Sequence, residues 1–186
     1  NLRSHAHRVH AARTVGQAPE LVVSSVIVCK RHLSASPLPD EHFAYLFTFR
    51  FLLERLSWIV RDRGATLDYT LAHIVRFKLA QLRAYEARLK AEPSAATKVE
   101  WANVDAHGGR IDQPNRVEQL QLADISASAI FQAFEPDQFG NTETRYLTEL
   151  APRLYRRPPG PLTSYGLKMH PWNETTKAAY PWVAAL

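Results

Sequence analysis

Short segments with the pattern of β-strands alternate with longer segments of helical period along this chain of 186 residues. Residues 21–30 form the clearest strand, because they are rich in β-branched side chains, almost continuously apolar and preceded by Pro19. A run of this kind is typical of a strand that is buried on both faces. Because strand and helix patterns alternate, the sequence predicts an α/β fold in which helices flank a mixed sheet.

Apolar residues recur mostly at three- and four-residue spacing in four further segments, which predicts helices. The predicted helices span residues 41–63, 75–91, 117–135 and 142–155. Asp40 is a suitable N-cap for the first of these helices, and Gly64 is a suitable stop. Pro152 lies inside the last helix and should kink or restart it.

Three more strands are predicted, at residues 65–74, 98–104 and 162–168. The first of these segments alternates between apolar and polar side chains, which is the pattern of a half-buried strand. Residues 105–116 are polar and contain Gly108, Gly109 and Pro114, so we expect a mobile loop there.

The composition is that of a globular protein, because 46% of the residues are hydrophobic and 22% are charged. At this length we expect one domain over residues 1–186. Residues 1–19 would form an N-terminal arm, either extended or as a short polar helix. Residues 170–186 would form a C-terminal tail whose aromatic side chains lie across the body of the protein or across a partner subunit, so a homodimer is one alternative.

The formal net charge of +5 is compatible with a nucleic-acid partner. Basic side chains gather in the helix predicted at residues 75–91, where they form either a solvated face or a nucleic-acid contact. The single cysteine, Cys29, excludes an internal disulfide framework and favours a reducing, cytoplasmic compartment. No apolar run approaches the roughly 20 residues that a membrane-spanning helix needs, so no membrane partner is expected.

One acidic residue, Asp124, lies near the start of the helix predicted at residues 117–135. The residues that follow it, from Ser126 to Ala129, are small and allow another backbone to approach closely. Asp124 is therefore either a metal-binding or catalytic carboxylate, or an acid that is bonded to a nearby backbone group or arginine.

Three sequence strings carry a resemblance to a known family. They are Glu-Gln-Leu-Gln-Leu-Ala-Asp at residues 118–124, Pro-Arg-Leu-Tyr at residues 152–155 and Tyr-Gly-Leu-Lys at residues 165–168, with Tyr146 between the first two. On these strings, residues 20–172 resemble the "domain of unknown function 3800" family. The resemblance implies a ribonuclease-H-like fold.

Such a fold implies a cluster of acidic residues that holds Mg²⁺ or Mn²⁺. Carboxylates suit this purpose because Mg²⁺ is a hard ion that prefers oxygen ligands. The bound metal activates water and stabilises the transition state of phosphodiester cleavage. The last acid of such a site commonly comes from the final core helix, and Asp124 matches that position. The resemblance therefore implies a metal-dependent nuclease with Asp124 as a metal ligand or catalytic residue.

The chain departs from the family's pattern at the other expected ligands. Family members typically open with a strand that carries Asp-Glu-Ser-Gly, and this chain lacks that string, so we expect a fold that is incomplete at the N-terminus. A further acid is expected at the end of the strand at residues 65–74. Asp68 as a metal ligand, or His73 as a ligand or general base, could replace it; otherwise they are a solvent-facing acid and an ordinary strand-end histidine. They lie on opposite faces of the strand, so at most one can point at Asp124.

Weaker candidates lie near the same helix and in the first segment of the chain. Glu118 and Asp105 flank the entrance to the helix that carries Asp124. His7 and His10 have a spacing that suits two metal ligands on one helix face, but no third ligand is near them in the sequence. The alternative for this segment is a solvated basic surface.

Two functions from different classes remain. The sequence has no glycine-rich nucleotide-binding loop, Cys-x-x-Cys pair, His-Glu-x-x-His helix or Gly-x-Ser-x-Gly elbow. The first hypothesis is a metal-dependent nuclease that acts on nucleic acid. The second is a non-catalytic module on the same fold that binds nucleic acid or protein, within a prokaryotic defence or mobile-element complex.

Overall fold

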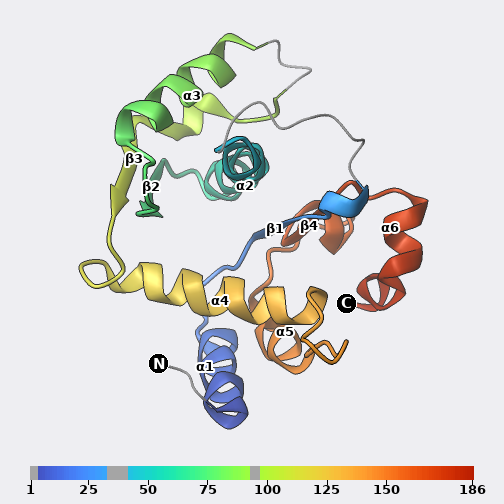
Figure 1. The fold of residues 1–186 in the computed structure, drawn as a ribbon. Coiled ribbons are helices and arrows are strands. Elements are labelled where there is room, and N and C mark those ends of the chain that lie inside the picture. The colour runs from blue at the N-terminus through green and yellow to red at the C-terminus, as the bar shows by residue number, and fades with distance from the viewer. Residues whose placement is uncertain (1–3, 33–41, 93–96) are drawn as a thin grey trace. The chain divides into compact units, whose positions relative to one another are not determined.

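The computed structural model describes residues 4–32, 42–92 and 97–186, which form a mixed α/β structure (Figure 1). The chain forms two compact units. The terminal unit consists of Asn1–Ser25 with Gln121–Leu186, and the central unit consists of Val26–Leu120. The predicted α/β class is confirmed. The single-domain organisation and the ribonuclease-H-like assignment stay predictions.

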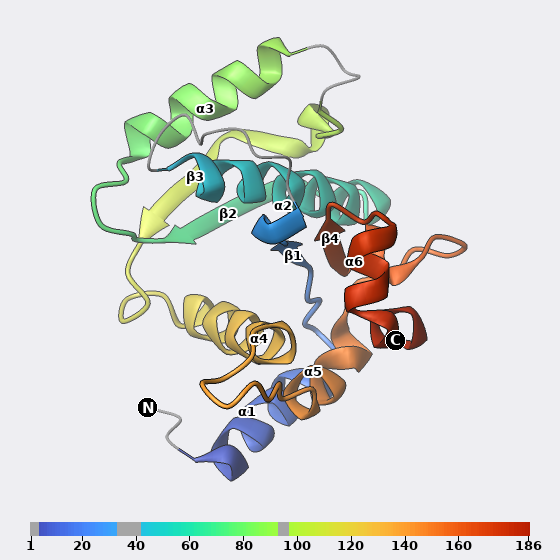
Figure 2. The ribbon, with the colours of Figure 1, turned by 45° about the vertical axis from the view of Figure 1, so that its right-hand side comes forward.

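The central unit is built on two parallel strands, β2 (Leu67–Ala72) and β3 (Val104–Asp112). Figure 2 shows the two strands lying side by side. Helix α2 (Phe43–Asp62) contacts β2, and helix α3 (Leu79–Ala91) contacts β3. The strands and helices therefore form two layers, with the apolar side chains of the unit between them.

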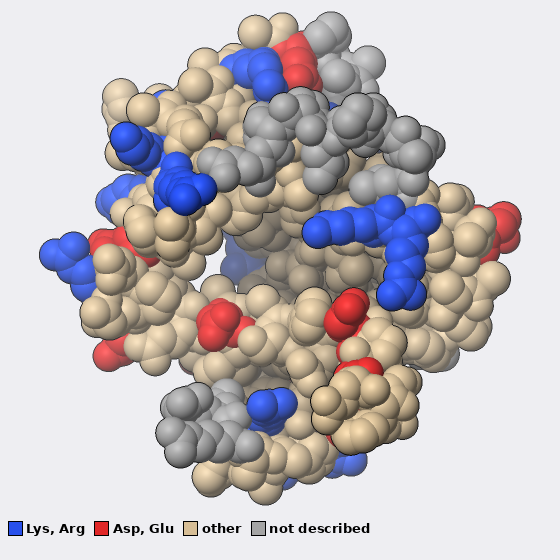
Figure 3. Space-filling view, viewed as in Figure 1, with Lys and Arg blue, Asp and Glu red and all other residues tan. Residues whose placement is uncertain are grey.

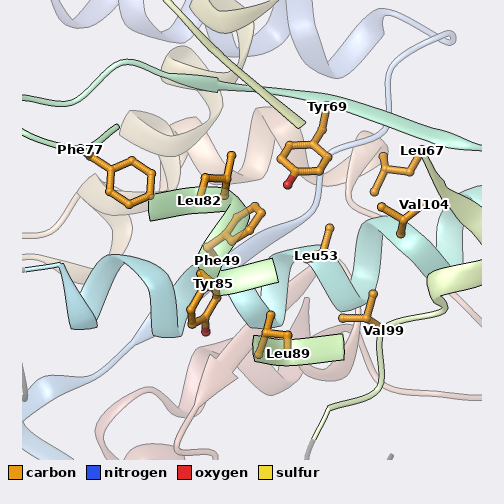
Figure 4. Close-up of a cluster of buried hydrophobic side chains, with 10 residues drawn as sticks. All are labelled: Phe49, Leu53, Leu67, Tyr69, Phe77, Leu82, Tyr85, Leu89, Val99 and Val104. Carbon is orange, nitrogen blue, oxygen red and sulfur yellow. The ribbon is translucent and has the colours of Figure 1, made fainter. Parts of the chain in front are cut away.

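The core of the central unit combines side chains from both helices and both strands (Figure 4). Its buried members are Phe49, Leu53, Leu67, Tyr69, Phe77, Leu82, Tyr85, Leu89, Val99 and Val104. Burying a large apolar side chain stabilises a fold by about 1.5–3 kcal/mol. The apolar spacing that predicts α2 and α3 thus reflects the faces that these helices bury.

Strand β3 corrects two predictions. Residues 98–104 were expected as a strand and 105–116 as a mobile loop, but the strand runs from Val104 to Asp112 and a short 3-10 helix precedes it at Trp101–Asn103. Gly108 and Gly109 are buried within the strand. A Cβ on Gly109 would lie 2.6 Å from the Tyr69 hydroxyl oxygen. The glycines therefore permit a close approach between neighbouring elements, whereas the sequence pattern alone suggests a turn.

The terminal unit contains the N-terminal helix α1 (His5–Gln17), so the helical alternative for residues 1–19 is confirmed. The helix starts at Ser4, whose hydroxyl oxygen accepts a hydrogen bond from the His7 N–H at 3.2 Å. It packs against α5 (Arg145–Leu150) and is not a detached arm. A Cβ on Gly16 would lie 1.9 Å from the carbonyl oxygen of Glu149, so glycine sets the closeness of this contact.

The C-terminal tail packs against its own unit. It forms α6 (Glu174–Ala179) and a 3-10 helix, Pro181–Ala185. The rings of Tyr180 and Trp182 lie 5.2 and 5.0 Å from that of Phe134, at the end of α4 (Glu118–Phe134). Of the two alternatives for the tail, the structure supports the one in which it lies across the body of the protein.

The remaining elements agree with the sequence in position more than in extent. The first strand is short, β1 (Ser25–Val28), and its residues are half-buried, not fully buried as predicted. It forms a two-stranded sheet with β4 (Leu167–His170), so the described residues contain two small sheets instead of one mixed sheet. Gly64 has a φ of 63°, as expected for the residue that ends α2. A 3-10 helix, Ala151–Arg153, follows α5 and contains Pro152, so the α-helix is interrupted there as the proline predicts. Asp40, the predicted cap of α2, lies outside the described residues.

Candidate functional site

Asp68 is engaged by an arginine from the neighbouring strand. Its side chain is exposed on β2, and its Oδ2 lies 2.6 Å from Nη2 of Arg110 on β3. A guanidinium at this distance neutralises the carboxylate and occupies the oxygen that a metal ion would need. The geometry is therefore that of a surface ion pair, and a metal-binding role for Asp68 would require Arg110 to move away.

His73 lies one residue beyond β2, at the carboxyl end of the parallel pair. Its backbone N–H donates to the carbonyl of Asp112, the last residue of β3, at 2.8 Å, and its ring is exposed. The Asp112 Oδ1 accepts the Gln113 N–H at 2.8 Å and lies 3.8 Å from Nη1 of Arg116. Ligands of α/β sheets commonly bind at this edge, so His73 and Asp112 occupy a suitable position, although Asp112 is already partly neutralised.

Asp124 lies on a different compact unit from Asp68 and His73. It is exposed on α4, and its carboxylate makes no hydrogen bond or ion pair with any other residue that the structure describes. The alternative of an acid bonded to a nearby backbone group or arginine is therefore not what the described residues show. His73 and Asp112 are neighbours at one end of the strand pair in the central unit, Asp68 lies further back on β2, and Asp124 belongs to the terminal unit.

No group of three or more His, Cys, Asp and Glu side chains placed to hold a metal ion occurs within residues 4–32, 42–92 and 97–186. Of the weaker candidates, Asp105 accepts the backbone N–H of His107 at 2.7 Å, and Glu118 is an exposed residue in the first turn of α4. His7 and His10 are exposed on α1 (His5–Gln17). The metal-binding roles stay predictions from the sequence.

A buried polar network in the central unit was not foreseen from the sequence. The Tyr69 hydroxyl donates to Oε1 of buried Glu86, whose Oε2 accepts from Arg83 Nη1 at 2.9 Å. Arg83 Nη2 also donates to the carbonyls of His107 and Gly109, at 3.0 and 2.6 Å. Burial raises the pKa of Tyr69, and the hydrogen bond and charge of Glu86 raise it further, so the phenol stays protonated. The network is fully paired and fixes α3 on β3.

A second buried pair fixes the segment before β3 on α2. Oε2 of Glu54 lies 2.9 Å from Nη1 of its neighbour Arg55, and both side chains are buried. Glu54 Oε1 accepts the backbone N–H of Lys98 at 3.1 Å, and the Trp58 indole donates to the Lys98 carbonyl at 2.8 Å. Adjacent Glu and Arg residues do not face one another on a helix by spacing alone, so this pair could not be predicted from the sequence pattern.

The exposed charge on α3 has one sign. Its only acid, Glu86, is buried in the network with Tyr69, while Arg88 and Lys90 are exposed and Lys78 immediately precedes the helix. The Arg88 guanidinium lies 4.9 Å from the Tyr85 ring centre, and the Lys90 ammonium lies 4.9 Å from that of Trp101. Glu92, the half-buried C-cap, is the nearest acid in the chain after them. Figure 3 shows basic side chains over the part of the surface that α3 and β3 form.

Among the described residues, no helix combines the length and the hydrophobicity that crossing a membrane requires. In comparisons with known proteins, the chain matches no family model, no curated protein and no solved structure.

Proposed function

We propose that this protein is a ribonuclease-H-like module that binds nucleic acid through its phosphate backbone. The observation that supports this function best is the charge distribution on α3. The single acid of the helix is buried and paired, whereas Lys78, Arg88 and Lys90 face solvent. A helix surface with this arrangement attracts a polyanion and does not repel it locally.

The positions of two of these cations favour binding further. Arg88 and Lys90 each lie over an aromatic ring, which restricts their side-chain motion before any ligand arrives. Side chains that are already ordered lose less conformational entropy on binding. Contacts of this kind go to phosphates and not to base edges, so we expect binding that depends little on sequence and strongly on salt.

The test is the affinity for fluorescently labelled DNA and RNA, measured by anisotropy between about 50 and 200 mM salt. We expect the variant with both Lys78→Ala and Lys90→Ala to bind about tenfold more weakly, with a salt slope that is smaller by about 2. A matched control with Arg8→Ala and Lys177→Ala removes the same charge from the terminal unit and should bind as the wild type does. Absence of binding at low salt, or equal weakening in both variants, would contradict the proposal.

A second candidate function is metal-dependent cleavage of a phosphodiester, with Mg²⁺ or Mn²⁺ as the cofactor. The observation that favours it is the exposed Asp124 carboxylate, which has no partner among the described side chains and so keeps both oxygens for a hard cation. The resemblance of residues 118–124 to the family motif gives the same residue this role.

Cleavage assays on DNA and RNA with Mg²⁺ or Mn²⁺ test this second function. We expect that Asp124→Asn and a chelator each abolish the activity, because a neutral amide is a much weaker ligand for a divalent cation. Asp137→Asn removes an acid elsewhere in the terminal unit and is expected to leave the rate unchanged. Equal rates for the wild type and Asp124→Asn would exclude the catalytic role of Asp124.

A further inference from the structure

Two phenylalanine side chains of the terminal unit are exposed to water. Phe131 lies near the end of α4 and has an exposed fraction of 57%, and Phe139 lies in the turn that follows and has an exposed fraction of 77%. In the described parts of the chain, all other Phe, Tyr and Trp side chains are buried or half-buried. Aromatic side chains are enriched in the cores of protein interfaces and among the residues that contribute most to binding, so these two rings mark a candidate interaction surface.

The turn that carries Phe139 is held by hydrogen bonds to Asp137. The Asp137 Oδ1 accepts the backbone N–H groups of Phe139 and Asn141, at 2.8 and 2.9 Å, and the Asp137 N–H donates to the Asn141 carbonyl at 2.8 Å. Gly140 adopts a φ of 84°, which a residue without a side chain does without strain. The turn is therefore ordered before a partner arrives, so its backbone loses little conformational entropy on binding.

This turn lies beside the end of α4 that carries Phe131. The Glu143 N–H donates to the Gln132 carbonyl at 2.8 Å, so the chain returns after the turn to the residue next to Phe131. The Glu135 N–H donates to the Phe131 carbonyl at 2.9 Å, and residues four apart on a helix share one face, so the Glu135 carboxylate lies one helical turn from the Phe131 ring. We call the surface formed by the end of α4 and this turn the acidic aromatic surface, and its members are Phe131, Glu135, Asp137 and Phe139.

The charge of this part of the chain is negative, although the whole chain carries a net charge of +5. Residues 121–144 contain four acids and no lysine, arginine or histidine. Of these acids, Glu143 lies 3.4 Å from Nδ1 of His5. Within the part of the chain that the structure describes, no cation forms an ion pair with Glu135 or Asp137. The acidic aromatic surface therefore attracts cations and repels polyanions.

We propose that the acidic aromatic surface binds a basic segment of another protein, in which lysine or arginine side chains flank an apolar residue. The apolar residue would cover the two phenylalanine rings and remove their apolar area from water. The cationic side chains would pair with Glu135 and Asp137 and lie over the faces of the rings, which attract a cation. Nucleic acid and anionic lipid carry charge of the same sign as this surface, so they are repelled from it.

This interaction does not rest on the proposed nucleic-acid contact or on a catalytic role of Asp124. Lys78 and Lys90 belong to the central unit, and Asp124 is not a member of the acidic aromatic surface. The two functions can therefore fail separately. A variant with Lys78→Ala and Lys90→Ala should bind a basic segment as the wild type does, even if it no longer binds polynucleotides.

The experiment measures the binding of the full chain to three fluorescently labelled synthetic peptides of equal length by anisotropy. The first peptide combines lysine and leucine, the second has serine in place of every leucine, and the third has glutamate in place of every lysine. We expect the wild type to bind the lysine–leucine peptide about tenfold more tightly than either of the others, because only this peptide offers both positive charge and apolar area. Equal binding of the lysine–leucine and lysine–serine peptides, or no binding of the first at about 1 mM, overturns the proposal.

A pair of double variants tests whether the two rings make the contact. The variant with Phe131→Ser and Phe139→Ser should bind the lysine–leucine peptide about tenfold more weakly or worse. The control with Val75→Ser and Leu79→Ser removes two exposed apolar side chains from the central unit and should bind as the wild type does. Equal affinities for the two double variants would overturn the proposal.

A charge reversal and the oligomeric state complete the test. Glu135→Lys should weaken binding of the same peptide about tenfold, whereas Glu20→Lys, at an exposed acid elsewhere in the terminal unit, should not. Thermal unfolding of each variant should match the wild type, because the substituted side chains are exposed. Sedimentation velocity at about 0.1 mM tests a second copy of the chain as the occupant, since weak interfaces assemble only at high concentration. A monomer that binds the peptide supports the proposal, and a dimer that Phe131→Ser with Phe139→Ser dissociates overturns it.

Discussion

Glu149 on α5 binds two arginines, Arg13 of α1 and Arg145 of its own helix. Arg13 donates to it twice, from Nε and Nη2 at 3.0 Å each, and Arg145 donates from Nε at 2.9 Å. The hydrogen bond from Arg13 is the main reason why the pKa of Glu149 is lowered from 4.5 to about 2. Such a bidentate contact is the strongest geometry that an arginine and a carboxylate form.

We predict that this ion pair makes the terminal unit sensitive to acid. The folded state binds a proton on Glu149 less readily than the unfolded state does, so the stabilisation is complete above pH 4.5 and is lost as the pH falls from there towards about 2. Urea unfolding between pH 6 and pH 3 measures how the free energy of unfolding depends on pH. The variant Glu149→Gln should be less stable than the wild type at pH 6 and should lose less stability as the pH falls. Glu174→Gln, which removes an exposed ion pair with Lys177 in the same unit, is the control. An unchanged pH dependence in Glu149→Gln would contradict the prediction.

At the scale of elements, the pairing of β2 with β3 depends on the absence of a side chain at Gly109. The register places Tyr69 opposite Gly109, and Arg83 reaches the Gly109 carbonyl from α3. Because Gly109 has no side chain, the Tyr69 ring and the Arg83 guanidinium can both lie close to this position of β3. This arrangement also explains why the buried Glu86 finds both of its partners.

We predict that Gly109→Ala destabilises the central unit by about 1–3 kcal/mol, the usual cost of overpacking a well-packed site. The new Cβ would lie 2.6 Å from the Tyr69 hydroxyl oxygen and 3.2 Å from Arg83 Nη1, so the network must shift. Denaturant unfolding measures the change. Ala106→Ser, at an exposed position of the same strand, should stay within about 0.5 kcal/mol of the wild type. A Gly109→Ala chain as stable as the wild type would show that the two elements are further apart.

At the scale of the whole molecule, the C-terminal tail contributes to the core of the terminal unit. Val183 has an exposed fraction of 2%, and Trp182 lies on Phe134. We predict that a chain cut after Met169 loses about 3 kcal/mol or more, since removal of large core side chains costs this much. Thermal unfolding tests this, with Thr175→Ala as an exposed control in the tail. A cut chain with unchanged unfolding but half the mass in light scattering would show instead that the tail joins two subunits.

The spacing of apolar residues and the glycine after a helix predicted the positions of helices correctly from the sequence. The helix predicted at residues 117–135 is α4. Gly64 follows the end of α2, as its position in the sequence predicts. The candidate site was only partly accessible in this way. The string that ends at Asp124 singles out an acid that is indeed exposed, but spacing along the chain could not show that Arg110 would reach Asp68. That pair depends on the register of two strands about forty residues apart, which no local pattern encodes.

The sequence by itself determined the α/β class and the approximate position of most helices, because hydrophobic periodicity is a local property that a helix must satisfy to bury one face. Only the tertiary structure decided the position of β3, the partners of the charged residues and the exposure of Phe131 and Phe139. In the sequence, the pair Gly108-Gly109 reads the same whether it forms a turn or lies in a closely packed strand. In the same way, the sequence does not show whether an arginine has an acidic partner. What distinguishes them is the set of groups that distant segments bring to within hydrogen-bond distance, and that set exists only in the folded chain.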